Sequence, residues 1–533
     1  MVKNLSRLWG FALLVAWGVD TLFWEKTPGI SFAVFVAACL LVGFALAYGE
    51  GLRPARASLL LLLPLGFFAA MSAVRQEAFT RGLDYLFSLG LLALLAASFL
   101  GGRWPFYRVV DYLVAAFQLI LSAIARLGMA WSAQRKVAKE NDSDPGRVPA
   151  WVHAGPALRG LLLALPVVIL FSGLLASADL VFSQRLEEFL KLIRIENLGE
   201  YLFRLFYILV LSWAFAGIYL YALTASRDKQ VTANDRPSLS PFLGFTEAIV
   251  VLGSVNLLFA FFVGIQFRYF FGGQANIHRL GYTYSEYARR GFGELVLVAC
   301  LSLLLYLGLV AIAKRANPAQ RWVFSAMGIA LLALIAVMLA SAFQRLALYE
   351  HAYGFTGLRT YTHIFMIWLG ILLLVVVGLE IAGRQRFFPL AALLAALGFG
   401  VTLNLIDVEA FIVRQNVARV QAAYPLDSAY LGRLSSDATP ALAQAYLGAG
   451  LPAGLPAADR DELGAILACR AARLAEQGRL PWQAFTASRY REEGVLRGLR
   501  EALRVYPVRK DAYGQWLVWV GGDGRYCDPG HVD

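Results

Sequence analysis

The stretch "LVLVACLSLLLYLGLVAI", residues 295–312, contains no charged side chain. A helix needs about 20 apolar residues to cross the hydrocarbon core of a bilayer, which is about 30 Å thick. The strands of a membrane β-barrel are shorter, with about ten residues of alternating polarity. A continuous apolar run of this length therefore predicts a membrane-spanning helix.

Runs of the same kind recur along the chain. Hydrophobic residues make up 59% of the 533 residues and charged residues only 16%, which lies outside the range of ordinary soluble domains. We predict an all-α fold, a polytopic transmembrane helical bundle of about eleven spans. The predicted spans are 8–24, 29–48, 57–74, 83–100, 158–178, 201–223, 243–267, 292–313, 322–343, 362–381 and 388–406.

The distribution of lysine and arginine among the loops predicts the orientation. With the N-terminus in the cytoplasm, nineteen of these residues fall in the inner segments and twelve in the outer loops. Loops that stay in the cytoplasm usually carry the excess of positive charge. We therefore expect the N-terminus inside and the part of the chain after the eleventh span outside.

Residues 107–131 form a further apolar run within a predicted cytoplasmic region, 101–157. If this run crossed the membrane, the basic residues that follow it would move to the outer side, against the charge rule. We expect a helix that lies in the membrane interface, with Asp111 and Gln118 facing water.

The composition changes after residue 406, where charged residues return at the density of a soluble protein. We predict two domains, a transmembrane helical domain over 1–406 and a small, mostly helical extracytoplasmic domain over 407–533. Asp427 is a candidate N-cap, as is Ser436 or Asp437 before the next helix, and Gly478 is a candidate helix stop. The tail "QWLVWVGGDGRY" predicts a short strand and a turn.

The four cysteines fall into two groups. Cys39 and Cys300 lie in predicted spans, whereas Cys469 and Cys527 lie in the last domain. Outside the cytoplasm the second pair can form a disulfide, and two unpaired thiols, one of them packed on a helix, fit the sequence equally well. The five histidines share no ligand spacing, so no metal site is predicted.

The sequence carries no motif for a nucleotide or a redox cofactor. We find no P-loop, no dinucleotide-binding glycine pattern after a strand and no HExxH, so no cofactor is expected and an ATPase or a soluble-type redox enzyme is set aside. The formal net charge of +12 is explained by basic loops that face anionic lipids. Membrane lipids are the expected partners, and nucleic acid is not.

Polar residues gather at the predicted outer ends of the spans. Before the eighth span, Tyr287, Arg290 and Glu294 recur at helical spacing and share one face, where Arg290 and Glu294 can pair. Charge this close to hydrocarbon needs a partner or water. One interpretation is snorkelling arginines and interhelical ion pairs that fix the packing. The other is an outward-facing vestibule that binds an anionic or zwitterionic ligand, lined by Arg268, Tyr287, Arg290, Glu294, Arg345, Glu350, Arg359, His363 and Asp407.

Several segments resemble a known family. "NLLFAFFVGIQFRYFFGG", "YSEYARRGFGEL" and "FQRLALYEHAYGFTGLRTYTHIFMIWLG" are similar, in this order, to segments of the bacterial integral-membrane family of domain of unknown function 4173, which is related to the 4153-type family. The resemblance implies a multi-pass protein of the bacterial cytoplasmic (inner) membrane with an extracytoplasmic helical C-terminus. It implies no activity and no catalytic residues. The family's asparagine–arginine pattern after the last span is less clean here, so no role is assigned to Asn416 and Arg419.

Three functional hypotheses follow. The favoured one is a non-enzymatic envelope scaffold or sensor whose outer domain and vestibule bind a partner protein or a lipid-linked ligand. The second is a transporter for a small anion, although no symmetric pair of broken spans is visible. The third, an enzyme, is less favoured: a membrane transferase that acts on a lipid-linked substrate, with Glu294, Glu350, Asp407 or His363 as acid or base.

Overall fold

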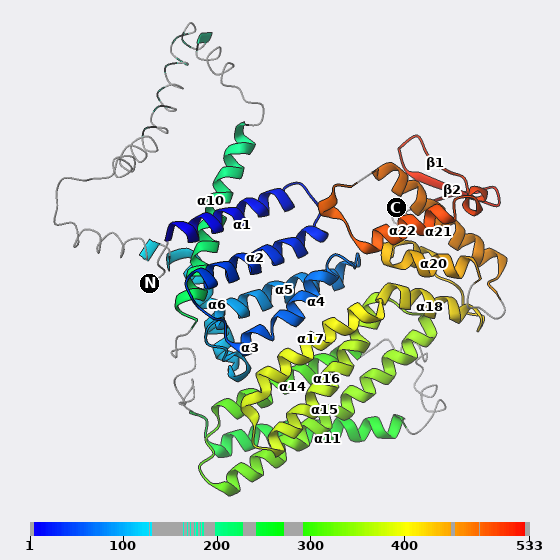
Figure 1. Cartoon of the computed structure of the whole chain (residues 1–533). Helices are drawn as coiled ribbons and strands as arrows, with labels where there is room; N and C mark the ends of the chain where they lie inside the picture. Colours follow the sequence, from blue (N-terminus) through cyan, green and yellow to red (C-terminus); the bar gives the residue numbers. More distant parts are fainter. Residues whose placement is uncertain are drawn as a thin grey trace, which may run out of the picture. The chain divides into compact units, whose positions relative to one another are not determined.

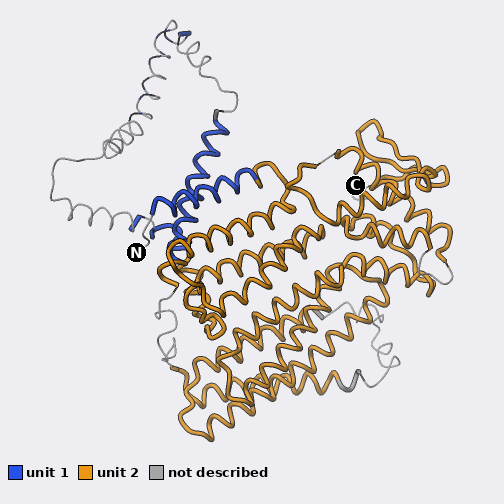
Figure 2. The backbone as a smooth tube through the Cα atoms, in the orientation of Figure 1, with its two compact units in different colours: residues 1–21, 120–221 blue, residues 22–119, 222–533 orange. Residues whose placement is uncertain are grey.

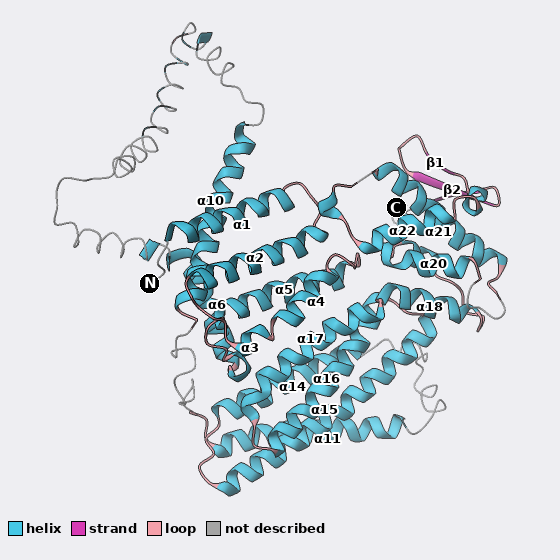
Figure 3. Ribbon diagram, viewed as in Figure 1, coloured by secondary structure: helices cyan, strands magenta, loops and turns pink. Residues whose placement is uncertain are grey.

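The computed structural model is built almost entirely of helices (Figure 1; Figure 3). It describes residues 5–126, 128–129, isolated positions between 164 and 185, and then 198–226, 241–270, 292–448, 454–478 and 480–527. The predicted fifth span, 158–178, therefore lies outside the described residues apart from isolated positions. The all-α fold class is confirmed.

The chain divides into two compact units (Figure 2). Unit 1 contains residues 1–21 and 120–221, and unit 2 contains residues 22–119 and 222–533. These boundaries do not test the predicted division at residue 406, which stays a prediction.

Among the described residues, ten helices are long and apolar enough to cross a membrane. Nine of them correspond to predicted spans: α1 (Leu5–Phe23), α2 (Ile30–Gly49), α5 (Ala78–Ser98), α10 (Leu198–Thr224), α11 (Phe245–Phe270), α14 (Phe292–Ile312), α15 (Pro318–Tyr353), α16 (Gly357–Ile381) and α17 (Phe388–Ile406). The tenth runs over Val109–Arg126. It consists of α6 (Val109–Leu121) and a π-helical turn (Ser122–Arg126), in the segment expected to lie in the interface. Its length and composition also permit a crossing, so the interfacial placement stays a prediction.

The predicted third span is broken. Residues 57–74 were expected to form one helix, but the structure has α3 (Arg56–Leu59) and α4 (Leu62–Met71). Pro64 has no amide hydrogen to donate to the carbonyl of residue 60 and thereby removes one bond of a continuous helix. The amides of Leu60 and Leu61 instead bond three residues back, at 3.3 and 3.1 Å.

Within unit 1, a buried ion pair joins α1 to α10. Asp20 is 3% exposed, and both of its carboxylate oxygens accept from the guanidinium of Arg204, at 2.9 and 2.6 Å. Tyr207 donates to the same carboxylate. A charge inside a membrane span requires such compensation, which explains why Asp20 is tolerated in an apolar helix.

Within unit 2, helices α11, α14, α15 and α16 pack around one apolar core. Gly328 of α15 and Tyr306 of α14 lie close together, and a Cβ on the glycine would lie 2.4 Å from the ring. Small residues of this kind allow helices in a membrane to approach closely. The 36 residues of α15 give it a length of about 54 Å, well beyond the hydrocarbon thickness. Its last turns therefore extend past the apolar part of the bundle.

The chain after α17 forms a second apolar core of its own. Its elements are α18 (Val408–Val420), α19 (Ser428–Gly432), η5 (Ser436–Ala438), α20 (Thr439–Tyr446), α21 (Ala457–Gln477), η6 (Trp482–Ala484), α22 (Ala487–Gly498) and η7 (Ala502–Val505). Three antiparallel strands follow, β1 (Val508–Lys510), β2 (Trp516–Val520) and β3 (Asp523–Tyr526), in the order β1-β2-β3. The predicted strand and turn in this tail are thus part of a small sheet. A disulfide joins Cys469 of α21 to Cys527 after β3.

Two of the predicted helix signals are confirmed and one is wrong. The Asp427 carboxylate accepts from the Tyr430 amide at 2.9 Å, and α21 ends at Gly478 with φ +61°. Neither Ser436 nor Asp437 caps α20, because both residues lie inside the preceding turn η5. The carboxylate of Asp437 is directed instead to the loop between α4 and α5.

Candidate functional site

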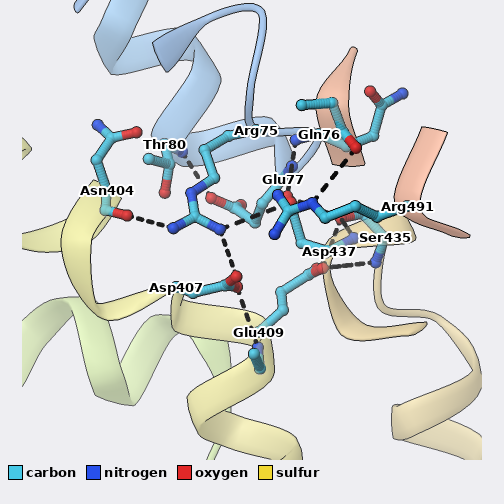
Figure 4. Close-up of polar contacts among 12 residues, drawn as sticks. Arg75, Gln76, Glu77, Thr80, Asn404, Asp407, Glu409, Ser435, Asp437 and Arg491 are labelled. Carbon is cyan, nitrogen blue, oxygen red and sulfur yellow. Dashed lines mark hydrogen bonds and ion pairs between the residues drawn. The ribbon is translucent and has the colours of Figure 1, made fainter. Parts of the chain in front are cut away.

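Nine described polar residues of unit 2 meet in one cluster, which we call the Arg75 cluster: Arg75, Gln76, Glu77, Asp84, Asn404, Asp407, Glu409, Ser435 and Asp437. All of them except Asp84 are labelled in Figure 4. Arg75 follows α4 and is 9% exposed. Its guanidinium donates to the carbonyl of Asn404 at the end of α17, pairs with Asp407, and lies 3.8 Å from the carboxylate of Asp437. One side chain thus joins three segments that are distant in the sequence.

Asp437 fixes the same loop through the backbone. One of its oxygens accepts from the amides of Gln76 and Glu77, at 2.7 and 2.8 Å. Glu77 in turn is the N-cap of α5, with bonds from the amides of Phe79 and Thr80. Asp437 therefore holds the loop between α4 and α5 to η5 in two ways: by its charge, which faces Arg75, and by the hydrogen bonds from two backbone amides of the loop.

Asp84 and Asn404 extend the cluster into the spans. Asn404 donates to Asp84 at 2.7 Å and to the carbonyl of Gly400 at 3.0 Å, and both side chains are fully buried. Buried polar groups of this kind cost free energy unless they are hydrogen-bonded, so the pair binds α5 to α17.

Glu409 occupies the centre of the contact between α18 and η5. Its two oxygens accept from the Ser435 amide at 2.9 and 2.8 Å, and one also accepts from the Ser435 hydroxyl. Burial raises the pKa of Glu409 to about 7, although the bonds from Ser435 oppose this rise. The carboxyl therefore changes its protonation near neutral pH.

This pKa predicts a pH-dependent stability. The folded-state pKa of Glu409 is above the ordinary value of 4.5. The stability that this carboxyl contributes is therefore fully present below pH 4.5 and is lost as the pH rises through about 7. The difference between the two pKa values corresponds to about 3 kcal/mol of stability.

Melting curves between pH 4.5 and 8 test this prediction. In the wild type the stability should decline as the pH rises, and Glu409→Gln should weaken that decline. Glu501→Gln, a change of an exposed carboxylate, should leave it as in the wild type, and equal slopes in all three proteins would contradict the assignment.

The turn between α15 and α16 is held by two residues of α18. The side-chain amide of Asn416 accepts from the Phe355 amide and donates to the Phe355 carbonyl, each at 2.8 Å. Arg419 donates to the carbonyls of His351 and Ala352 at the end of α15, at 2.9 and 3.1 Å. These contacts give Asn416 and Arg419, to which the sequence assigned no role, a structural one.

Gly354 makes this turn possible and provides a test. It adopts φ +84° and ψ 172°, a region that is almost restricted to glycine, and a Cβ would lie 2.6 Å from Arg419 Nη1 and 2.7 Å from Asn416 Oδ1. Gly354→Ala should therefore lower the free energy of unfolding by about 2 to 3 kcal/mol. In detergent unfolding curves, the matched control Gly383→Ala should lose less, because φ is +64° there and no atom lies within 4 Å of the added Cβ. Equal losses would show that the Arg419 and Asn416 contacts do not matter.

The predicted vestibule residues fall into separate places in the structure. Arg268, Tyr287 and Arg290 lie outside the described side chains. Asp407 belongs to the Arg75 cluster, where its backbone has φ +56° and its side chain caps α18. The others lie on α14, α15 and α16, and the vestibule itself stays a prediction.

Glu350 and His363 form a pair between α15 and α16. Glu350 Oε2 lies 2.9 Å from His363 Nδ1, and Nε2 of the same ring lies 3.3 Å from the Phe343 carbonyl. Arg359 stacks on the Tyr349 ring, 4.1 Å from its centroid, and donates to the Gly354 carbonyl. Three of the predicted site residues thus stabilise the α15–α16 turn.

Glu294 and Arg345 line a cavity of about 400 Å³. The remaining lining residues come from α11, α14 and α15 and are apolar: Leu258, Phe259, Phe262, Leu295, Val298 and Met338. The cavity combines two opposite charges with an apolar wall, an arrangement that suits an amphipathic molecule with an anionic or zwitterionic head. We call it the Glu294–Arg345 cavity.

Glu380 is one of the buried carboxylates that the sequence analysis did not select. Glu380, 5% exposed near the end of α16, accepts from the Ser325 hydroxyl of α15 and from the Gln385 side chain. It lies at the end of the bundle opposite the Arg75 cluster. In the sequence, the only signal for a buried Glu380 was its position as a single charge just inside the end of the apolar run 362–381. Among the described residues, no group of three His, Cys, Asp or Glu side chains has the geometry of a metal site.

The apolar helices define a multi-pass membrane protein. Residues 62–445 match the family described as Domain of unknown function (DUF4153), and because this range is well over half of the chain, the protein belongs to that family. The match corrects the resemblance to the related family 4173. Comparisons with curated proteins and with solved structures found no match. The matched range contains the whole Arg75 cluster and the Glu294–Arg345 cavity.

Proposed function

We propose that the protein is an envelope scaffold or sensor of the bacterial cytoplasmic membrane, with its C-terminal helices outside the cytoplasm. The observation that carries the proposal is the threefold contact of Arg75 with Asn404, Asp407 and Asp437. A partner that moves η5 also moves Asp437 relative to Arg75. The environment of the Arg75 guanidinium, which lies where α4, α5 and α17 meet, then changes. Binding outside is thereby coupled to the spans.

The disulfide supports the outer location of the C-terminal helices. Disulfides persist in oxidising compartments and are rare in the cytoplasm. The charge distribution of the loops favours the same orientation. In addition, the amide of Leu100 donates to the Ser226 hydroxyl at 3.0 Å, so the ends of α5 and α10 lie on the same side.

Reporter fusions test this orientation. A reporter that is active only outside the cytoplasm should be active after Asp533 and inactive after Arg103 and after Val137. A fusion after Asp533 that is active only in the cytoplasm would contradict the orientation. Opposite results at Arg103 and Val137 would make Val109–Arg126 a true span.

The Glu294–Arg345 cavity supports a ligand with a charged head and an apolar body, such as a lipid or a lipid-linked precursor. An acid–base role for His363 is disfavoured, because both ring nitrogens already face acceptors, Glu350 and the Phe343 carbonyl. A general base needs a nitrogen within reach of the substrate. The site therefore supports binding more than catalysis.

Profiling of copurified lipids and metabolites tests the binding role. A discrete species should be enriched with the wild type and reduced at least tenfold with Arg345→Ala. The control Arg384→Ala removes an exposed arginine after α16, and this variant should retain the copurified species at the wild-type level. Identical profiles for all three proteins would overturn the cavity as a ligand site, and turnover of the bound species by the purified protein would favour the transferase instead.

A further inference from the structure

The segment of residues 480–490, which we call the aromatic segment, exposes an unusual set of side chains. Leu480, Trp482, Phe485 and Tyr490 are 41%, 58%, 44% and 69% exposed. They surround the turn η6 and the start of α22, in a part of the chain with its own apolar core. A contiguous group of exposed aromatic residues marks a surface that is covered in the functional state.

Backbone hydrogen bonds hold this segment against the ends of two apolar helices, α2 and α4. The Ile30 amide, at the start of α2, donates to the Phe485 carbonyl at 2.9 Å. The amides of Ala487 and Ser488 donate to the carbonyls of Ala73 and Val74, just after α4, at 2.8 and 3.1 Å. These contacts are independent of which side is the cytoplasm. The aromatic segment therefore lies at the level where the apolar helices end.

The approach to α2 is close. A Cβ on Gly29 would lie 2.5 Å from the Phe485 carbonyl oxygen, so the backbones touch at this position. The Thr486 hydroxyl also donates to the side chain of Gln76, at 2.9 Å. The segment is thus fixed in place by several contacts and presents its aromatic rings from a rigid base.

The segment encloses a groove of about 210 Å³ that contains an incompletely bonded cation. Arg489 lines the groove together with Trp482, Phe485 and Tyr490. Its Nη1 donates to Gln477 at 2.8 Å and its Nε lies 3.6 Å from Glu493, whereas its buried Nη2 makes no hydrogen bond with the described residues. A buried guanidinium nitrogen without a partner is costly, and a phosphate oxygen would satisfy it.

We infer that the aromatic segment lies in the headgroup layer of the membrane leaflet that surrounds the start of α2, and that its groove binds a phospholipid whose phosphate accepts from Arg489. Tryptophan and tyrosine are enriched at this depth because their rings are apolar and their tips are polar. Continuity with α2 and α4 favours a lipid over a partner protein, since lipid already surrounds the adjoining spans. The C-terminal helices are then anchored to the membrane surface as well as to the Arg75 cluster.

Spin labels measure the depth of the segment. In a Cys39→Ser/Cys300→Ser protein in lipid nanodiscs, a nitroxide at Trp482→Cys should be at least twofold more accessible to oxygen than to a water-soluble nickel reagent. A label at Tyr513→Cys, where the native side chain is 90% exposed, should show the reverse. A label at position 482 that behaves as the label at 513 does would overturn the membrane contact.

Lipid titration tests the role of Arg489. Phosphatidylglycerol added to the detergent-solubilised protein should raise the Tm of the wild type and of Arg489→Lys, and the rise should fall to less than half in Arg489→Gln. Arg497→Gln, a change of an exposed arginine on the same helix, should respond as the wild type does. An undiminished rise in Arg489→Gln would overturn the groove as a phospholipid site. So would an equal rise with inorganic phosphate alone, which would indicate an anion site instead.

Discussion

Arg75→Ala is expected to lower the free energy of unfolding by about 3 to 5 kcal/mol, because it leaves the carboxylates of Asp407 and Asp437 at a mostly buried site without their cation. Asp437 is almost fully buried, with 1% of its side chain exposed. Thermal or denaturant unfolding in detergent measures the loss. The control Arg433→Ala removes an exposed arginine of the same C-terminal helical part and should stay within about 0.5 kcal/mol of the wild type.

A double mutant separates the ion pair from general damage. Asp407→Asn keeps both the N-cap oxygen of α18 and a residue that tolerates the left-handed backbone, so it removes mainly the charge. If Arg75 and Asp407 act as a pair, the double mutant Arg75→Ala/Asp407→Asn should be more stable than the sum of the single losses predicts. Strictly additive losses would show that the two residues act independently.

Removal of the disulfide is expected to produce a loss of similar size. The bridge between Cys469 and Cys527 closes a loop with a sequence separation of 58 residues, for which the chain-entropy account gives about 4 kcal/mol. Cys469→Ala/Cys527→Ala should therefore unfold at a markedly lower temperature than the wild type. Cys39→Ala/Cys300→Ala alters only unbridged cysteines and should change the melting curve much less.

A reducing agent provides the second arm of this experiment. Dithiothreitol should lower the Tm of the wild type toward that of Cys469→Ala/Cys527→Ala and leave the double variant unchanged. A wild-type Tm that does not respond to the reagent, together with Cys469 that reacts with a thiol label before reduction, would contradict the bridge.

The sequence predicted the parts of the fold that depend on local composition. The last span was predicted over 388–406, the bounds of α17, because an apolar run ends abruptly at Asp407. By contrast, α15 runs ten residues beyond the predicted end of its span. Polarity marks where hydrocarbon ends, but a helix continues in water until a residue such as Gly354 stops it. Pro64 was visible in the sequence, and its effect on α4 was underestimated.

The candidate site was predicted less well, because its contacts join remote parts of the chain. Asp407 was selected for its charge at the end of a span, but its partner Arg75, in the loop after α4, was not among the predicted site residues. The bond from Gln76 to Asp437 spans 361 positions, a contact that no local pattern encodes. Local spacing suggested instead that Asp437 caps a helix. Glu350 and His363 were both selected as polar residues near the ends of spans, but their mutual pairing required the packing of α15 against α16.

The contact of Arg75 with Asn404 also sets an order of events during biogenesis. The two residues are 329 positions apart, and chains are synthesised and inserted from the N-terminus. The loop after α4 must therefore wait, with its cation unsatisfied, until the ribosome has completed the last span and the C-terminal helices. A truncated chain never reaches that state. The complete Arg75 cluster can therefore form only after the chain has been synthesised as far as Asp437.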